Sequence, residues 1–352
     1  MTEDALVAAM RSRGAALVAE AERPVAAHFG DAVAEYAAMR DAAAVVELPW
    51  IERLRATGAD RIGFLQGMLS NDVVKLAPGS GCRALLLSEQ GKVVGDLVVL
   101  AGEDVIALDG VGAASTVRTA LERFVVADDV DLVPAAPGYA FALLGPDASD
   151  VLARLGLSAP NDPCAHAPAA IADGEPHVVR MSMPGAGGFL CRIPSAGAAV
   201  WWDRCVAAGG RPAGTDAFEV LRIEGGVPRH GRDVLVDTLA LEAPYEAAIS
   251  FRKGCYLGQE VMERVTARGH VNRRLVGIEV EGESESVPSP GARLFVGDRE
   301  VGWVTSAGRS WRLGRTIGLA YVRRGHFEPG SELALGVSGG SAVIVRALPF
   351  PA

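Results

Sequence analysis

Residues 271–352 limit the fold most strongly, because they contain short strand-like runs and no helical pattern. Five or six such runs occur, with glycine, proline and serine between them: RLVGIEVEG, RLFVG, REVGWVTSAG, TIGLAYVRR, SELALGV and SAVIVRAL. Short apolar runs separated by turn residues are typical of a small antiparallel barrel or sandwich. The sequence therefore predicts a separate all-β C-terminal domain over residues 271–352.

The preceding residues, 1–270, mix helical and strand patterns. The first 45 residues are rich in alanine at helical spacing, and residues 59–75 place Ile62, Leu65 and Leu69 on one helical face. RALLLS and KVVGDLVVL are strand-like runs joined by a turn at Glu89-Gln90-Gly91, which is a hairpin signal. We therefore expect an α+β core over residues 1–270.

Charge and cysteine usage narrow the class of protein. The formal net charge is −9, which argues against a general nucleic-acid surface. No apolar run is long enough to span a membrane, and the N-terminus carries acidic residues without a secretory core run. The five cysteines are odd in number and contain no C-x-x-C pair, so we expect neither a disulfide framework nor a metal site. These features favour a cytoplasmic protein that contacts neither nucleic acid nor membranes.

The segment FEVLRIEGGVPRHGRDV places Phe218 and Arg222 four residues apart, on one face of a predicted helix. An aromatic ring beside a guanidinium suits a ligand with a flat ring and a carboxylate, but the spacing alone favours a core phenylalanine beside a solvated arginine. Two groups of basic residues, at 229–232 and 252–274, could hold a polyanionic tail or could be solvated faces. The residues alone leave both questions open.

The segment FRKGCYLGQEVMERV surrounds a cysteine with polar groups. Arg252 and Lys253 precede Cys255, and a helix is expected to begin near Gly258. Cations and a helix N-terminus both lower the pKa of a thiol, and the thiolate is the reactive form. A lone cysteine is more often a small buried apolar residue, but the dense polar surroundings argue against that here. The surroundings therefore favour a reactive thiol at Cys255.

The eight residues KGCYLGQE, which span 253–260, resemble the K-G-C-Y-x-G-Q-E signature of the YgfZ-type folate-binding proteins. These proteins are relatives of the glycine-cleavage T-protein, an aminomethyltransferase. Other segments follow in the family's order, and the resemblance covers most of the chain: TGADRIGFLQGMLSNDV, LLLSEQGKVVGDLVV, RIEGGVPRHGRD, GHVNRRLVG and VGWVTSA.

The resemblance implies three subdomains in a ring around a folate channel, the third being a C-terminal antiparallel β-barrel. It implies tetrahydrofolate as the cofactor, with or without a polyglutamate tail. It also implies client iron–sulfur enzymes as partners, tRNA-modifying ones among them, and we expect a monomer. Cys255 and Lys253 would be the catalytic residues, with the Cys255 thiolate either a transient iron ligand or a nucleophile toward a folate-bound one-carbon unit. The implied cofactor-binding residues are Trp50, Phe218, Arg222, Asn71, Asp96, Tyr256, Gln259 and Glu260.

Two departures from the T-protein pattern bear on the reaction. T-proteins carry a pair of aspartates where this chain has Gly95-Asp96, and an acidic residue in a loop that here contains Gly185–Gly188 without an acid. The leading interpretation is therefore a folate-binding accessory protein for assembly or repair of iron–sulfur enzymes. The alternatives are a folate-dependent aminomethyltransferase of the T-protein type and a non-catalytic folate-sensing scaffold.

Overall fold

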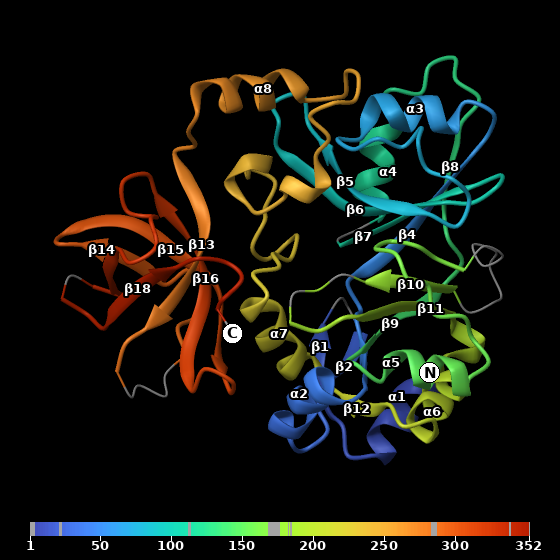
Figure 1. Ribbon diagram of the computed structural model, residues 1–352, viewed down its shortest axis with the longest axis horizontal. Coiled ribbons are helices and arrows are strands. Elements are labelled where there is room, and N and C mark those ends of the chain that lie inside the picture. Colours follow the sequence, from blue (N-terminus) through green and yellow to red (C-terminus); the bar gives the residue numbers. More distant parts are fainter. Residues whose placement is uncertain are drawn as a thin grey trace. The chain divides into compact units, whose positions relative to one another are not determined.

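The computed structural model describes residues 4–20, 23–111, 114–167, 177–181, 183, 185–282, 287–337 and 339–351 (Figure 1). The chain divides into two compact units that interleave along the sequence. Unit 1 comprises Met1–Leu86, Val94–Phe218 and Ala247–Leu257. Unit 2 comprises Leu87–Val93, Glu219–Glu246 and Gly258–Ala352. The division at residue 270 that the sequence favours stays a prediction.

The first sheet of unit 1 has the strand order β5-β6-β7-β4-β8. Its strands are β4 Ile51–Thr57, β5 Gly81–Leu87, β6 Val93–Ala101, β7 Ile106–Val111 and β8 Asp131–Pro134. Helices α3 (Arg61–Met68) and α4 (Ala114–Glu122) pack on it through Phe64, Leu65, Val117 and Leu121. The predicted hairpin is confirmed as β5 and β6, and Gly91 in its turn has the positive φ of +71° that glycine adopts without strain.

The second sheet of unit 1 has the order β10-β11-β9-β3-β12. Its strands are β3 Ala44–Glu47, β9 Gly138–Leu144, β10 His177–Met181, β11 Gly188–Pro194 and β12 Arg211–Ala213. Around it lie α1 Ala5–Ser12, α2 Ala32–Asp41, α5 Ala148–Arg154, η1 Ser195–Gly197 and α6 Ala198–Ala207, and α7 Thr215–Glu224 follows β12 in the chain. A single apolar core joins α1, α5 and α6 to this sheet, with Trp201 and Trp202 at its centre.

The prediction of helices throughout the first 45 residues is wrong in part. Between α1 and α2 the chain forms an antiparallel hairpin, β1 (Ala16–Glu20) with β2 (Arg23–His28). Alanine has the highest helix propensity, but propensity is a weak preference that tertiary packing overrides. The side chains of Val25 and Ala26 on β2 are buried.

The predicted C-terminal barrel is confirmed, and with it the α+β fold class. Six antiparallel strands close in the order β13-β16-β15-β14-β17-β18, drawn in orange and red in Figure 1. Their bounds are β13 Arg273–Val280, β14 Arg293–Val296, β15 Arg299–Ser310, β16 Arg315–Arg323, β17 Glu332–Leu335 and β18 Ala342–Arg346. The remaining elements are η2 Ala240–Glu242, η3 Glu246–Ala248 and α8 Gln259–Arg268. None of the helices that the structure describes has the length and apolar character needed to cross a membrane.

Candidate functional site

The loop that carries Cys255 is fastened to the end of α3. The N–H of Ser250 donates to the carbonyl of Ser70 at 2.9 Å, and that of Leu257 donates to the carbonyl of Gly67 at 3.0 Å. The hydroxyl of Ser70, which is fully buried, donates to the carbonyl of Ala248 at 2.6 Å. Backbone bonds of this kind fix the course of the loop before any side chain contributes.

Lys253 adds the strongest link between this loop and α3. Its Nζ donates to the carbonyls of Gln66, Leu69 (2.5 Å) and Asn71 (3.1 Å), and it lies 5.1 Å from the centre of the Tyr256 ring. An ammonium has three N–H donors, so all three are used. Carbonyls at a helix end lack partners within the helix and favour a cation. Burial lowers the pKa of Lys253 to about 8, although Asp72 opposes the shift.

Lys253→Met is expected to reduce the free energy of unfolding by about 2–4 kcal/mol, because the buried carbonyls lose a charged donor. Urea titration measures the change. Lys75→Met is the matched control, since the Lys75 side chain is 78% exposed and pairs with Asp72 at the surface; about 0.5 kcal/mol or less is expected there. Equal effects of the two substitutions would show that Lys253 does not fasten the loop.

Cys255 is the exposed cysteine of the chain, whereas Cys191 and Cys205 are buried and Cys82 and Cys164 are half-buried. Burial raises the pKa of Cys82 and of Cys205 to about 12. It also raises the pKa of Cys164 and of Cys191. Burial therefore disfavours both access and thiolate formation at the other four cysteines, and Cys255 is the accessible one.

Asp96 is a buried carboxylate held by one arginine. Nη2 of Arg83 lies 3.0 Å from Oδ1 and 2.9 Å from Oδ2 of Asp96. The preceding residue, Gly95, packs closely against α4, because a Cβ there would lie 2.9 Å from Val117 Cγ2. A second carboxylate at this position would therefore require Val117 or α4 to shift.

Asn71, another predicted cofactor-binding residue, joins β5 to the Cys255 loop. Its Nδ2 donates to the carbonyl of Arg83 at 2.7 Å and to that of Ala247 at 3.4 Å. Its Oδ1 accepts from the N–H of Asp72 at 2.9 Å. The amide thus has partners on three backbone groups, and its predicted contact with a cofactor stays a prediction.

Trp50 and Phe218, which are far apart in sequence, form an aromatic pair in unit 1. Their ring centres are 5.9 Å apart with the planes tilted by 45°. Phe218 is buried, whereas Trp50 remains partly exposed. Trp50 directly precedes Ile51 on β4. Ile51 and Asp96 pair with Val111 of β7 from its two sides, so the three residues form one row across the sheet. The sheet thus places an accessible indole and the Asp96 carboxylate at the same end of the first sheet.

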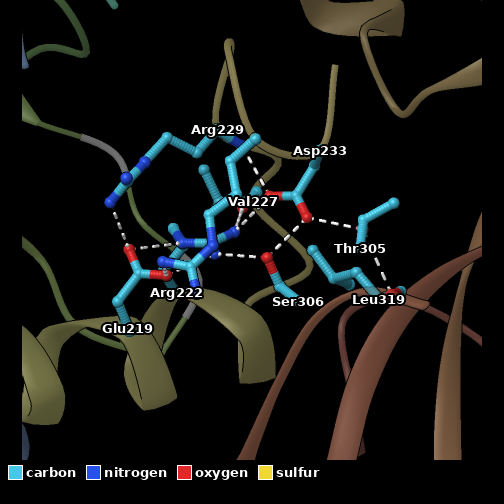
Figure 2. Close-up of polar contacts among 9 residues, drawn as sticks. Glu219, Arg222, Val227, Arg229, Asp233, Thr305, Ser306 and Leu319 are labelled. Atoms are coloured by element: carbon cyan, nitrogen blue, oxygen red, sulfur yellow. Dashed lines mark hydrogen bonds and ion pairs between the residues drawn. The ribbon is translucent and has the colours of Figure 1, made fainter. Parts of the chain in front are cut away.

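Arg222 is enclosed by acceptors within unit 2 (Figure 2). Its Nε and Nη2 donate to the two oxygens of Glu219, at 3.0 and 2.5 Å. Nη1 donates to Asp233 (2.7 Å) and to the carbonyl of Val227 (2.9 Å), and Nη2 also donates to Ser306 (2.9 Å). These contacts occupy all five N–H groups of the guanidinium, so none is left for a folate tail in this arrangement. The predicted contact of Arg222 with folate stays a prediction.

Asp233 accepts hydrogen bonds from both sides of this cluster. Oδ2 accepts from Arg222 and from the N–H of Arg229, and Oδ1 accepts from Thr305 and Ser306, both at 2.6 Å. Thr305 has no partner in the register between β15 and β16, so it is the extra residue of a β-bulge. A bulge redirects side chains, which explains how consecutive residues of one strand reach the same carboxylate.

The basic cluster around Arg229 is neutralised in the same way. Arg229 and Arg232 pair with Glu219 at 3.1 and 3.0 Å. Burial acts to raise the pKa of Glu219, but the three arginines outweigh it and lower the pKa. This cluster therefore offers less free positive charge to a polyanion than its sequence suggests.

Comparison with known proteins identifies the family. Residues 6–253 match the GCVT N-terminal domain, and residues 273–351 match the glycine cleavage T-protein C-terminal barrel domain. The chain belongs to the glycine cleavage T-protein family. The order of these two domains agrees with the fold described above.

Several relatives of the T-protein family cover nearly the whole chain. An aminomethyltransferase of Listeria monocytogenes serotype 4a is 30% identical over 330 residues, which is 92% of this chain and 90% of that protein. An aminomethyltransferase of Geobacillus kaustophilus is 32% identical over 335 residues, covering 90% and 89%. The crystal structure of the glycine cleavage system aminomethyltransferase T from Bartonella henselae matches with a TM-score of 0.88 at 22% identity, over 99% of this chain and 97% of that one, and shows the shared fold.

The remaining predicted site residues follow Cys255 directly. Tyr256 is buried against Lys253, Gln259 donates to Glu263 on α8 at 2.8 Å, and Glu260 is exposed. Helix α8 begins at Gln259, as the sequence predicts, after Gly258 with a φ of +82°. Only glycine fits there, because a Cβ would also lie 2.5 Å from the Ser88 carbonyl oxygen.

Sequence reasoning missed the residues that position the site. Ser70 bonds the Cys255 loop, and Arg83 bonds Asp96. Asp233 accepts from Arg222, and Thr305 in turn donates to Asp233. A buried serine or a strand bulge leaves no periodic signal. Asp233 lay within the quoted segment RIEGGVPRHGRD, but its partners are on a strand more than 70 residues away.

Proposed function

We propose that this chain binds tetrahydrofolate and uses it in one-carbon chemistry. The observation that carries the proposal is the end of the first sheet, where the Trp50–Phe218 pair flanks the row that contains Asp96. An accessible indole suits the flat face of a pterin, and a carboxylate suits its N–H donors. The T-protein family, with its folate-dependent fold, supports the assignment.

Aminomethyl transfer is the reaction that the comparisons favour over an iron–sulfur role. The relatives that cover about nine-tenths of this chain are named aminomethyltransferases. Asp96 would be the carboxylate beside the folate in such a reaction. Gly95 argues against this reaction, because it supplies no second carboxylate and a side chain there would require Val117 to shift.

A second candidate, a YgfZ-type accessory role toward iron–sulfur enzymes, is favoured by one specific observation. The signature residues 253–260 surround an exposed thiol on a loop that is firmly held by Lys253. A fixed and accessible thiolate suits transient binding of iron or attack on a one-carbon unit. In this second role, polyglutamylated folate would be the ligand and client iron–sulfur enzymes would be the partners.

Two assays on the purified protein and on a deletion strain separate the candidates. Glycine-dependent formation of methylene-tetrahydrofolate with a lipoylated carrier protein would establish aminomethyl transfer. Its absence, together with loss of iron–sulfur enzyme activity in a strain carrying Cys255→Ser, would establish the accessory role. If Cys255→Ser retained full activity, a folate-sensing scaffold would be the better description.

Trp50→Ala is expected to weaken tetrahydrofolate binding about fivefold to tenfold, because stacking on one ring contributes on the order of 1 kcal/mol. Trp50→Phe is the matched control: it keeps an aromatic ring, so affinity should stay close to that of the original chain while folate-induced tryptophan quenching decreases. Fluorescence and calorimetric titration give the two readouts. If Trp50→Ala and Trp50→Phe bound tetrahydrofolate with equal affinity, Trp50 would not be part of the binding site.

A further inference from the structure

A pocket of about 400 Å³ lies in unit 1, beside the start of β4. Its walls come from β4, from residues 134–138, where β8 ends and β9 begins, and from the end of β11. The charged side chains that line it are Arg23, Arg53, Arg192 and Glu52. This volume falls within the range of pockets that hold small ligands.

Arg53 is the arginine of the pocket whose charge is fully balanced. Its Nε and Nη2 donate to the two oxygens of Asp109 at 2.5 and 2.7 Å. Burial acts to raise the pKa of Asp109, but Arg53 outweighs it and the pKa is lowered. This pair therefore stays ionised and contributes no net charge to the pocket.

Arg23 is balanced only in part. Its Nη2 lies 2.6 Å from Oε1 of Glu47. Burial raises the pKa of Glu47 to about 7, even though Arg23 opposes the shift. Near neutral pH a substantial fraction of Glu47 is therefore protonated, and the guanidinium of Arg23 keeps excess positive charge.

Arg192 has the fewest partners of the three. Nη1 donates to the carbonyl of Ile51 at 2.8 Å. Within the described part of the chain it forms no ion pair, so most of its five N–H groups remain available to a ligand. Burial lowers the pKa of Arg192, and Arg53 and Arg23 lower it further, whereas Asp109 and Glu52 act to raise it.

Glu52 also lines the pocket and offsets this positive charge only in part. Its Oε2 accepts from the N–H of Ala114 at 2.6 Å, at the start of α4, and the side chain is exposed. An exposed carboxylate is screened by water and salt. The half-buried Arg192 guanidinium keeps the stronger local field.

We infer that this pocket binds a small oxyanion, a carboxylate or a phosphate, through Arg192 with help from Arg23. Guanidinium groups bind both anions through paired N–H···O bonds. Pro49 and Ile51, which line the pocket, flank Trp50 in the chain. The anion could therefore be free or could be a carboxylate of a folate's glutamyl tail, and only the second source rests on the proposed function.

The test compares the original chain with Arg192→Gln, using inorganic phosphate and glutarate as probes at low, constant ionic strength. Calorimetric titration gives the affinity, and the thermal midpoint gives an independent readout, because a ligand that binds the folded state raises it. Arg192→Gln is expected to weaken binding about tenfold or more. Arg118→Gln is the matched control, since Arg118 lies outside the pocket with a half-exposed side chain paired with Glu122.

Arg192→Lys keeps a positive charge without the planar fork and is expected to retain intermediate affinity, so it carries the test if Arg192→Gln fails to fold. A further arm compares mono- and triglutamyl tetrahydrofolate: a preference for the longer tail that Arg192→Gln abolishes identifies the tail as the ligand. Equal probe affinity in Arg192→Gln and Arg118→Gln would overturn the inference. So would failure of the original chain to bind either free anion, whatever the outcome with folate.

Discussion

Arg222→Met is expected to reduce the free energy of unfolding by about 3–5 kcal/mol, the range found when one partner of a buried ion pair is removed. Methionine fills much of the space but leaves Glu219 and Asp233 without their shared cation. Asp233 is fully buried and Arg222 is 2% exposed, so water cannot replace the lost bonds without opening the cluster. The hydroxyls of Thr305 and Ser306 still reach Asp233, but they cannot neutralise it.

Urea titration measures this effect, and Arg293→Met provides the matched control. Arg293 also belongs to unit 2 and pairs with Glu300, but its side chain is 54% exposed. Exposed pairs contribute about 0–1 kcal/mol. Adding Asp233→Asn to Arg222→Met should recover part of the loss by removing a buried charge. A loss below about 1 kcal/mol for Arg222→Met would show that the cluster does not stabilise the fold.

The barrel and the β5–β6 hairpin could be predicted from the sequence because both depend on local patterns. Alternating apolar residues and glycine turns act over a few positions. The β5–β6 pair and three of the six barrel pairings join strands that are consecutive in the chain. The start of α8 was predictable for the same reason, since Gly258 gives a local signal. The hairpin β1–β2 was missed because its alanines are compatible with a helix and only packing decides.

The site was predictable as a set of residues but not as a set of contacts. Phe218 and Trp50 were both assigned to one ligand, and the structure brings their rings together. Arg222 was expected to face a ligand, yet Asp233, Glu219 and a bulge on β15 take its hydrogen bonds. Lys253 was expected to activate a thiol, yet its partners are carbonyls more than 180 residues earlier. Helical spacing shows which face a residue occupies, not which distant group meets it.

Alkylation by iodoacetamide at pH 8 is expected to modify Cys255 at least about a hundredfold faster than Cys205. Thiolate is the reacting form, and a pKa of about 12 leaves Cys205 and Cys82 with a thiolate fraction of about one in ten thousand at that pH. Burial also blocks access to Cys191 and Cys205, whereas Cys255 is exposed. Mass spectrometry of each cysteine-containing peptide against time gives the individual rates.

The same experiment separates access from activation at Cys255. Cys255→Ser should leave the slow rates of the other four thiols unchanged, because its side chain lies at the surface and packs on no core. Lys253→Ala tests activation: if the Lys253 ammonium serves α3 alone, the effect should be confined to stability and the alkylation rate of Cys255 should change less than about twofold in the folded protein. A tenfold fall in that rate, with folding intact, would instead show that Lys253 activates the thiol. Modification of Cys205 as fast as Cys255 would contradict the burial on which the ranking depends, and an iron-binding or nucleophilic role would then have no distinct thiol to carry it.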